Sequence, residues 1–295
     1  MKCVFFYNPL SGKGKVIKHL DKIEKALKEK FEDVDIYATK SMEDTIQKAQ
    51  EACGKYDVLI FAGGDGTFNN IATGVSSCHK RPILGYIPTG TVNDIARNLN
   101  ISRNINKALQ VIIDGNCIYH DVGKINDQYF IYVSGIGTFT GVSYRTKQKT
   151  KRMFGRLAYV LDGLKEIALP QINSVRIETE KEVVQMDAPL LLVVNTISVG
   201  GMRFNPGGHL NDGYFDIIIV KKGVTKGLIN IIKLFILGIG RKKTTGHFLC
   251  LNSKKFKITV DKDVIWCVDG EAGPKGEVII QNLHNHLQIY APKKK

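Results

Sequence analysis

The sequence predicts an α/β domain followed by a β-rich, sandwich-like domain, with the active site in the cleft between them. The chain has 295 residues, which exceeds the usual size of one domain. Strand and helix patterns alternate four times in the first part, as in a parallel sheet with helices on both faces. Strand-like segments dominate the rest. We therefore predict an α/β domain over 1–118 and a β-rich domain over 119–295, whose last strand is free to return to the first domain.

The composition is that of a globular protein with a strongly basic balance. Hydrophobic residues make up 43% and charged residues 24% of the chain, which excludes a disordered chain. Lys and Arg number 42 against 28 Asp and Glu, giving a net charge of +14. This charge implies attraction to nucleic acid, to a nucleotide or to an anionic membrane surface, and does not choose among them.

Cysteine usage and the N-terminus indicate the cytosol. The cysteines form no Cys-x-x-Cys pair, and we interpret them as small buried hydrophobes in a reducing compartment. Asn8-Pro9 comes too early for a signal peptide, and no apolar run approaches the roughly 18 residues of a membrane span. The six are Cys3, Cys53, Cys78, Cys117, Cys250 and Cys267.

The first strand, over residues 2–7, leads into a polar turn over 8–15 and a helix over about 16–30. The turn is not a Walker A loop, because Leu10 stands where its first glycine belongs and Val16 where its Ser or Thr belongs. A polar, glycine-bearing turn at the carboxyl end of a strand remains.

Three more strands follow in the same pattern. Val34–Ala38 ends at Thr39 before a helix over about 42–53, the run from Asp57 leads into FAGGDGTFNN at 61–70, and Ile83–Ile87 leads into Pro88–Asp94. Ligands bind at the carboxyl ends of parallel strands. The loops after residues 7, 38, 62 and 87 therefore share one edge of the predicted sheet.

The glycine turn at 63–66 predicts a phosphate site. Gly63, Gly64 and Gly66 leave no side chain between backbone and ligand and permit the positive φ angles of a nest of amides. Asp65 would repel a phosphate by about 4 kcal/mol at about 4 Å and an effective dielectric near 20, so a cation must lie between them. We predict a polyphosphate site with Mg²⁺.

The second domain is predicted from strand-like segments and two helical exceptions. Phe154–Leu169 has helical spacing, and the apolar run Leu228–Ile239 is either a core helix or a membrane wedge. The predicted strands are Cys117–Ile125, Gln128–Val133, Ile172–Glu178, Val183–Asn195, Tyr214–Val220, Phe256–Val260, Val264–Val268 and Leu287–Tyr290.

The motifs together resemble the diacylglycerol kinase catalytic family. Gly63-Gly64-Asp65-Gly66-Thr67 is shared by several ATP-using kinases, and Pro88–Arg97 resembles this lipid kinase family in particular. Asn8–Gly12 and Val268–Glu271 resemble it as well, so the likeness runs in order over nearly the whole chain. It implies an ATP- and Mg²⁺-dependent kinase acting on a lipid hydroxyl.

The resemblance also implies the ATP-binding residues. Asn70 departs from the pattern, since many bacterial members carry Glu there, which puts any charge-based role at this position in doubt. Helix capping is the alternative for Asn69 and Asn70. The implied residues are Asn8, Pro9, Leu10, Ser11, Gly12, Thr39, Gly64, Asp65, Gly66, Thr67, Phe68, Asn69, Asn70 and Thr91.

Two carboxylates near the end join Asp65 as catalytic candidates. Asp269 and Glu271 are two residues apart, so on a strand they would share a face. The resemblance points to Glu271 as proton acceptor and to Asp269 as tied to the metal, although either could reach a hydroxyl. An ordinary Asp-Gly turn is the alternative.

A further acidic turn stands at Asp212-Gly213. It is either a hairpin signal or, by resemblance, a structural Mg²⁺ site formed by the Asp212 carboxylate and the carbonyls of His209 and Tyr214.

Basic clusters predict contact with a membrane. A kinase that takes its substrate from a bilayer needs a basic and apolar face, and each basic residue near anionic lipid contributes about 1 kcal/mol. We therefore expect a cytoplasmic protein held peripherally at the inner face of the membrane. The clusters are Arg145, Lys147, Lys149, Lys151, Arg152 and Arg156; Lys221 and Lys222; and Arg241, Lys242 and Lys243.

The predicted reaction transfers the γ-phosphoryl group of ATP to a lipid hydroxyl, with diacylglycerol giving phosphatidic acid as first choice. A sphingoid base, phosphatidylglycerol or soluble NAD are alternative acceptors. A nucleic-acid-binding protein is the non-enzymatic alternative, but it has no need of a Gly-Asp-Gly turn, and we expect no nucleic acid partner. The sequence does not determine the acceptor or its acyl-chain preference. It also leaves the oligomeric state open, with a homodimer as one alternative.

Overall fold

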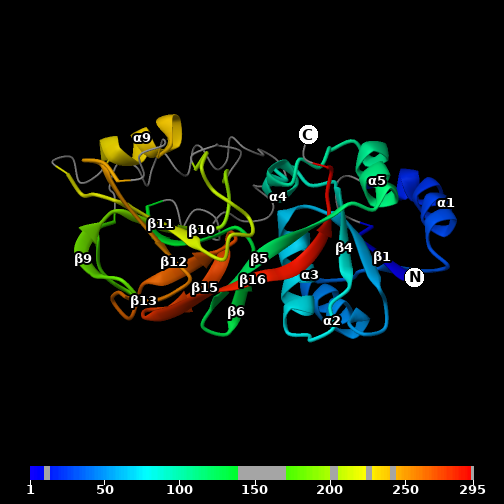
Figure 1. The fold of residues 1–295 in the computed structure, drawn as a ribbon, viewed down its shortest axis with the longest axis horizontal. Helices are drawn as coiled ribbons and strands as arrows, with labels where there is room; N and C mark the ends of the chain where they lie inside the picture. Colours follow the sequence, from blue (N-terminus) through cyan, green and yellow to red (C-terminus); the bar gives the residue numbers. More distant parts are fainter. Residues whose placement is uncertain (10–13, 139–170, 200–204, 224–227, 240–243, 294–295) are drawn as a thin grey trace. The chain divides into compact units, whose positions relative to one another are not determined.

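The chain divides into two compact units. A computed structural model describes residues 1–9, 14–138, 171–199, 205–223, 228–239 and 244–293. Unit 1 comprises Met1–Val122 and Asn285–Lys295, and unit 2 comprises Gly123–His284. Two strands, β5 (Cys117–Ile125) and β16 (Val278–Tyr290), run from one unit into the other (Figure 1).

Several predicted features lie outside the described residues. They are Leu10, Ser11 and Gly12 of the first turn, the helix Phe154–Leu169, the basic cluster Arg145–Arg156, and Arg241–Lys243.

Unit 1 contains the predicted parallel sheet, in the order β2-β1-β3-β4. Cys3 lies opposite Val34 and Val58, and Val58 lies opposite Ile83, with all three strand pairs parallel. The carboxyl ends of the four strands therefore meet at one edge, as the sequence predicts. The end of β16 runs parallel to β4, with Ile289 opposite Leu84. The strands are β1 (Lys2–Tyr7), β2 (Asp33–Ala38), β3 (Val58–Gly63) and β4 (Ile83–Pro88).

Helices cover both faces of this sheet, with α2 and α3 on one and α1 and α5 on the other (Figure 1). Gly74 lets α2 and α3 touch, because a Cβ there would meet the Ala49 Cβ at 2.7 Å. The helices are η2 (Ile17–His19), α1 (Leu20–Lys30), α2 (Met42–Ala52), α3 (Asp65–Ser76), α4 (Asp94–Asn98) and α5 (Ile105–Asp114).

A disulfide between Cys53 and Cys78 corrects the expectation that the cysteines are small unpaired hydrophobes. Cys53 is the C-cap of α2, and Cys78 follows α3. The close packing of the two helices brings together ends that are 25 residues apart. Cys3 and Cys267 are buried, as expected.

Unit 2 is a β-sandwich. One layer contains β16, β13, β8 and β9 with the short strands beside them, and the other has the order β12-β11-β10-β7-β14-β15 in the part of the chain that the structure describes. The strands are β6 (Gln128–Phe130), β7 (Val133–Gly137), β8 (Asn173–Thr179), β9 (Val183–Ala188), β10 (Leu190–Val194), β11 (Phe215–Val220), β12 (Phe248–Ser253), β13 (Lys255–Thr259), β14 (Ile265–Val268) and β15 (Glu271–Lys275).

Two predicted strands are each divided. Pro189 separates β9 from β10, because proline has no N–H for the ladder. The break between β6 and β7 arises because backbone amides there donate to a side chain instead of a neighbouring strand. Strands β12 and β15, most of β16, and all of β7 after Val133 were not predicted.

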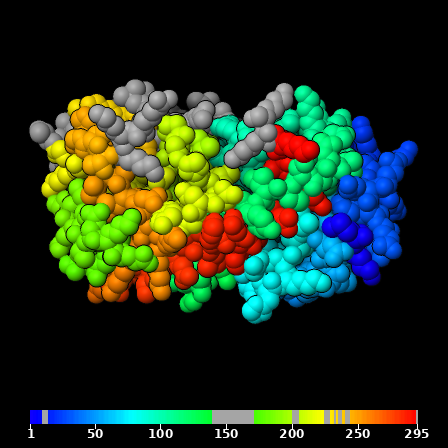
Figure 2. Space-filling model, in the orientation of Figure 1, coloured from blue at the N-terminus to red at the C-terminus, as the bar shows by residue number. Residues whose placement is uncertain are grey.

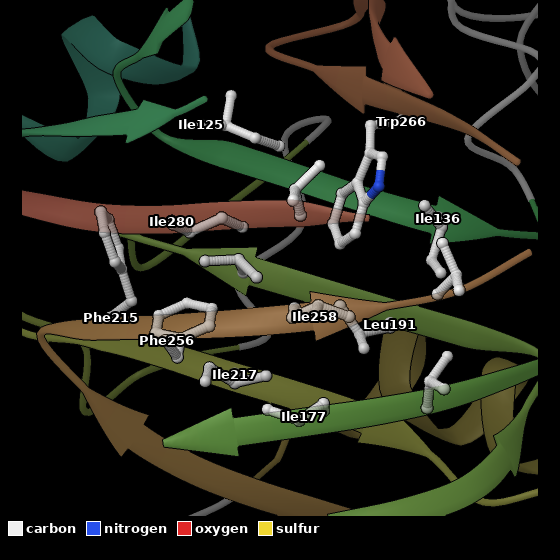
Figure 3. Packing of buried hydrophobic residues seen from close by; sticks show 14 of the residues in the cluster. Ile125, Ile136, Ile177, Leu191, Phe215, Ile217, Phe256, Ile258, Trp266 and Ile280 are labelled. Carbon is white, nitrogen blue, oxygen red and sulfur yellow. The ribbon is translucent and has the colours of Figure 1, made fainter. Parts of the chain in front are cut away.

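The sandwich core lies between the two layers. Phe215 and Phe256 meet edge to face at 6.3 Å, and Trp266 is fully buried among isoleucines (Figure 3). Strand β10 is buried on both faces: Leu191 and Val193 face this core, whereas Leu192 packs in a second cluster with helix α9 (Leu228–Leu237).

Candidate active site

Two glycine turns meet at the edge of the unit 1 sheet. The carbonyl of Gly63 accepts hydrogen bonds from the amides of Thr89, at 2.8 Å, and Gly90, at 3.2 Å. A Cβ on Gly90 would lie 2.5 Å from the Gly64 Cα, so Gly90 has no room for a larger residue, and a Cβ on Gly64 would lie 3.2 Å from the Gly90 Cα, which is a tight contact. The turns after β3 and β4 therefore form one continuous backbone surface.

Gly63 and Gly64 allow close approach of neighbouring groups, and no glycine of the first turn is needed for a positive φ. Gly64 has a φ of −104° and is the N-cap of α3, and neither Gly63 nor Gly66 has positive φ. The expected nest is therefore wrong. The N-terminus of a twelve-residue helix stands in its place, and its first amides lack partners within the helix. Such a terminus also suits phosphate.

Asp65 joins the two turns. Its Oδ1 accepts a hydrogen bond from the Ile95 amide at 3.0 Å. Burial raises the pKa of Asp65, and backbone amides at the start of α4 partly oppose that shift. Within the described residues no Lys or Arg pairs with it, whereas Asp94 pairs with Arg97 at 3.7 Å. A partly buried carboxylate that pairs with no Lys or Arg of the described residues, next to a helix N-terminus that suits phosphate, fits a divalent ion.

The second turn is rigid and carries a cation that the sequence reasoning missed. Asn93 has a φ of 55° and donates to the Gly90 carbonyl at 2.8 Å, while Tyr86 donates to the Asn93 Oδ1 at 3.3 Å. Arg103 Nη2 also reaches the Gly90 carbonyl, at 3.3 Å. Arg103 stands nine residues beyond Asp94, outside every motif, so no sequence signal marks it.

The remaining predicted nucleotide residues lie at strand ends or on α3. Thr39 follows β2, and its amide donates to the Tyr7 carbonyl at 2.8 Å. Asn69 and Asn70 are the fifth and sixth residues of α3, so the capping alternative is wrong. The buried Asn69 Oδ1 has no hydrogen-bond partner within the described chain, as expected of a group that meets a ligand.

The Asp269-Gly270 pair is a tight turn and not part of a strand. It joins β14 to β15, which pair antiparallel with Val268 opposite Glu271. Both turn residues have positive φ, 48° and 92°, as a type I′ turn requires. The expectation that Asp269 and Glu271 share a strand face is therefore wrong, because the turn lies between them.

The Asp269 carboxylate is engaged by the backbone. Its Oδ2 accepts from the Ile131 amide at 2.6 Å, and its Oδ1 accepts from Tyr132 at 3.1 Å and Val133 at 2.9 Å. Three amide donors hold this carboxylate in one position. Glu271 is exposed, so of the two carboxylates it is the one available to a substrate.

Comparisons with known proteins agree with these motifs. Residues 2–125 match the model of the diacylglycerol kinase catalytic domain, and residues 136–291 match that of the YegS C-terminal NAD kinase beta sandwich-like domain. A diacylglycerol kinase of Bacillus subtilis (strain 168) is 35% identical over 294 residues, covering 98% of this chain and 96% of the relative. The chain belongs to the diacylglycerol kinase family.

Further relatives of this kinase cover its full length. A diacylglycerol kinase of Staphylococcus aureus (strain Newman) is 39% identical, covering 97% of this chain and 91% of the relative. The crystal structure of a diacylglycerol kinase from Bacillus anthracis str. Sterne superposes with a TM-score of 0.85 and 27% identity, covering 99% and 97% of the two chains. The chain is thus a lipid kinase with an alcohol acceptor, and its family implies ATP use. The predicted fold class is confirmed.

The turn at Asp212 in this kinase is an Asx turn. The Tyr214 amide donates to Asp212 Oδ1 at 3.0 Å, and His284 Nε2 lies 3.1 Å from the Asn211 carbonyl. The hairpin reading is wrong, because β10 and β11 pair but are joined by residues 195–214. No group of three His, Cys, Asp or Glu side chains suited to a metal occurs in the described residues.

No helix among the described residues is long and apolar enough to cross a membrane.

Proposed function

We propose that this chain is an ATP- and Mg²⁺-dependent kinase that phosphorylates the hydroxyl of diacylglycerol to phosphatidic acid. The observation that carries the proposal is the junction of Gly64 and Gly90 at the N-terminus of α3, with the partly buried Asp65 beside it. The relatives named above as diacylglycerol kinases support the acceptor. The β-rich unit would supply the lipid site and the α/β unit the nucleotide site.

Phosphoryl transfer requires positioning and neutralisation of charge. The amides at the start of α3 would hold the phosphates, together with Asn8, Thr39, Asn69 and Thr91. A bound Mg²⁺ would neutralise charge between the phosphates and Asp65. Because Asp65 also accepts the Ile95 amide, it keeps the two turns in register around the ligand.

In this proposal Glu271 removes the proton from the acceptor hydroxyl. It is exposed and follows a turn that Asp269 fixes through three amides. A base must lie within hydrogen-bond reach of the proton that it removes, so the fixed turn would position Glu271. Asp269 is then a positioning residue.

The remaining assignments concern the surroundings of the reaction. Asp212 retains one carboxylate oxygen beyond its Asx bond, which fits a structural Mg²⁺ with the carbonyls of His209 and Tyr214. The net charge of +14 supports peripheral contact with the inner, anionic face of the membrane.

An acceptor screen tests the proposed function. The purified chain is incubated with γ-labelled ATP and Mg²⁺ and, side by side, with diacylglycerol, sphingosine, phosphatidylglycerol or NAD, and products are separated by thin-layer chromatography. We expect labelled phosphatidic acid. If only NADP or another phosphorylated lipid carried the label, that compound's precursor would be the acceptor in place of diacylglycerol. The absence of label with all four acceptors would contradict the proposal.

The metal role of Asp65 has its own test. Asp65→Asn keeps an acceptor for the Ile95 amide but removes the charge, so the fold should persist while turnover falls by at least a hundredfold. Thermal unfolding gives a second measurement: ADP with Mg²⁺ should stabilise the wild type more than the variant. Equal stabilisation of both proteins would refute this role.

A further inference from the structure

One long segment of unit 2 contains no acidic residue. Between Ile217 and Val260 the sequence has ten basic residues and no Asp or Glu, although the whole chain has 28 acidic residues. The segment includes most of β11 and all of α9, β12 and β13. The ten are Lys221, Lys222, Lys226, Lys233, Arg241, Lys242, Lys243, Lys254, Lys255 and Lys257.

Two of these lysines meet one histidine at the corner of α9 and β12. Lys221 continues β11, and its amide donates to the His247 carbonyl at 3.0 Å. Its Nζ donates to the Thr245 carbonyl, also at 3.0 Å. From α9, Lys233 Nζ lies 2.9 Å from His247 Nε2. Lys221, Lys233 and His247 are called the α9 basic corner below.

No carboxylate of the described residues balances the charge of this corner. Within the described residues, Lys221 and Lys233 form no ion pair, and their partners are a carbonyl and an imidazole. The adjacent Lys222, by contrast, pairs with Asp187 at 3.3 Å. Two ammonium groups held on one short turn, Lys221 on the Thr245 carbonyl and Lys233 on the His247 imidazole, with no carboxylate of the described residues paired to them, are suited to bind an anion with several oxygens.

The helix that supplies Lys233 favours a membrane as the source of that anion. Its sequence, LINIIKLFIL, is apolar except for Asn230 and Lys233. Ile231 and Leu234 are buried against the sheet, whereas Ile229 on the same helix is 49% exposed. Lys233 is half-buried, so its stem lies along apolar surface while its ammonium reaches polar surroundings. Yellow and orange atoms of this region lie at the surface (Figure 2).

We propose that the α9 basic corner binds the headgroup phosphate of an anionic phospholipid in a bilayer, and that exposed Ile229 enters the same surface. The phosphate oxygens accept hydrogen bonds from the two ammonium groups. Charge complementarity at the α9 basic corner orients unit 2 toward the bilayer. The proposal rests on the proposed lipid kinase function, because such an enzyme must meet its substrate at a membrane.

Sedimentation with vesicles tests the site without ATP. Wild-type chain is pelleted with phosphatidylcholine vesicles with and without phosphatidylglycerol. Lys233→Met should weaken binding to the anionic vesicles about fivefold, and Lys221→Gln with Lys233→Met about thirtyfold, since each charge contributes about a factor of five. Lys233→Arg, which keeps the charge, should bind like the wild type.

The control is Lys262→Met, an exposed lysine of the same unit that lies outside the acid-free segment. It should change binding less than twofold. An equal loss of vesicle binding in Lys262→Met and Lys233→Met would overturn the site. So would a loss of binding by Lys233→Met to neutral vesicles that is as large as its loss on anionic vesicles. Release of the wild type by millimolar inorganic phosphate, but not by potassium chloride of the same ionic strength, would mean a free-phosphate site and overturn the membrane assignment.

Turnover is measured separately on diacylglycerol dispersed in neutral detergent, where Lys233→Met should equal the wild type. A wild type without lipid phosphorylation would contradict the proposed function. Vesicle binding that does not depend on the α9 basic corner would contradict the site. The two failures are therefore distinguishable.

Discussion

At the residue scale, acidic side chains in this kinase hold backbone turns together. Asp65 accepts an amide of the second glycine turn, and Asp269 accepts three amides of the break between β6 and β7. Each carboxylate binds amides that a regular ladder or helix does not use. Their roles therefore include the shape of the site as well as its charge.

Asp269 and Glu271 are expected to separate stability from catalysis. Asp269→Asn tolerates the φ of 48° but replaces one acceptor oxygen by a donor, so the free energy of unfolding should fall by about 2–4 kcal/mol. Glu271→Gln should change the free energy of unfolding by less than about 0.5 kcal/mol, because the side chain is exposed. The same substitution should abolish turnover. Urea titration and the kinase assay measure the two effects; the opposite pattern would reverse the roles.

Gly90→Ala tests the junction of the two turns. The added methyl would lie 2.5 Å from the Gly64 Cα, and both atoms belong to backbone that cannot move independently. We expect a loss of about 1–3 kcal/mol in stability and a larger loss of ATP affinity. Gly207→Ala is the matched control, since its Cβ would meet nothing within 4 Å and it lies outside the predicted nucleotide residues. Equal ATP affinity in both variants would argue against the junction.

Arg103→Gln tests the cation missed by sequence reasoning. Its guanidinium donates a hydrogen bond to the Gly90 carbonyl. Burial raises the pKa of Tyr86, and the charge of Arg103 opposes part of this rise. If Arg103 faces bound phosphates, KM for ATP should rise about fivefold to tenfold, while Lys107→Gln on α5 should change it little. An unchanged KM would limit Arg103 to holding the turn.

At the element scale, α2 and α3 behave as one block. Gly74 brings the helices into contact, and the Cys53–Cys78 disulfide links their ends. Because α3 begins at Asp65, this block extends from the disulfide to the proposed nucleotide site.

The disulfide should stabilise unit 1 under oxidising conditions. Closing a loop with a sequence separation of 25 constrains the unfolded chain by about 3.5 kcal/mol. Oxidised wild type should therefore unfold at higher urea than the same protein with dithiothreitol, and Cys78→Ser should show no such difference. Thiol counting with a maleimide reports the state of the pair. If the wild type unfolded at the same urea concentration with and without dithiothreitol, the disulfide would make no such contribution.

At the scale of the whole molecule, stability is expected to fall in mild acid. Burial lowers the pKa of both His120 and His286 below the ordinary value of 6.5. The unfolded chain then binds more protons, so stability is complete above about pH 6.5 and is lost as pH falls through the lower folded pKa values. His286→Gln, which can still donate to the Ser76 carbonyl, should flatten this pH dependence. Melting curves from pH 7.5 to 5 measure it; a wild type of constant stability would contradict it.

The sequence by itself determined the parallel sheet, the sandwich and the turns that carry chemistry. Apolar runs, helical spacing and glycine turns depend on neighbours along the chain, and the four strands of unit 1 lie within one or two residues of their predicted ends. The motif at Gly63–Thr67 could likewise be found without coordinates, because its residue types follow from local backbone requirements.

Tertiary structure alone decided how these residues are used. Gly64 is needed because Gly90 approaches it from another strand, Asp269 is fixed by amides more than 130 residues away, and Lys233 meets His247 from a separate element. The disulfide, likewise, depends on packing between two helices. Contacts between distant segments leave no periodicity in the sequence, so a side chain's partner, and with it the choice between structural and catalytic roles, emerges only when the chain is folded.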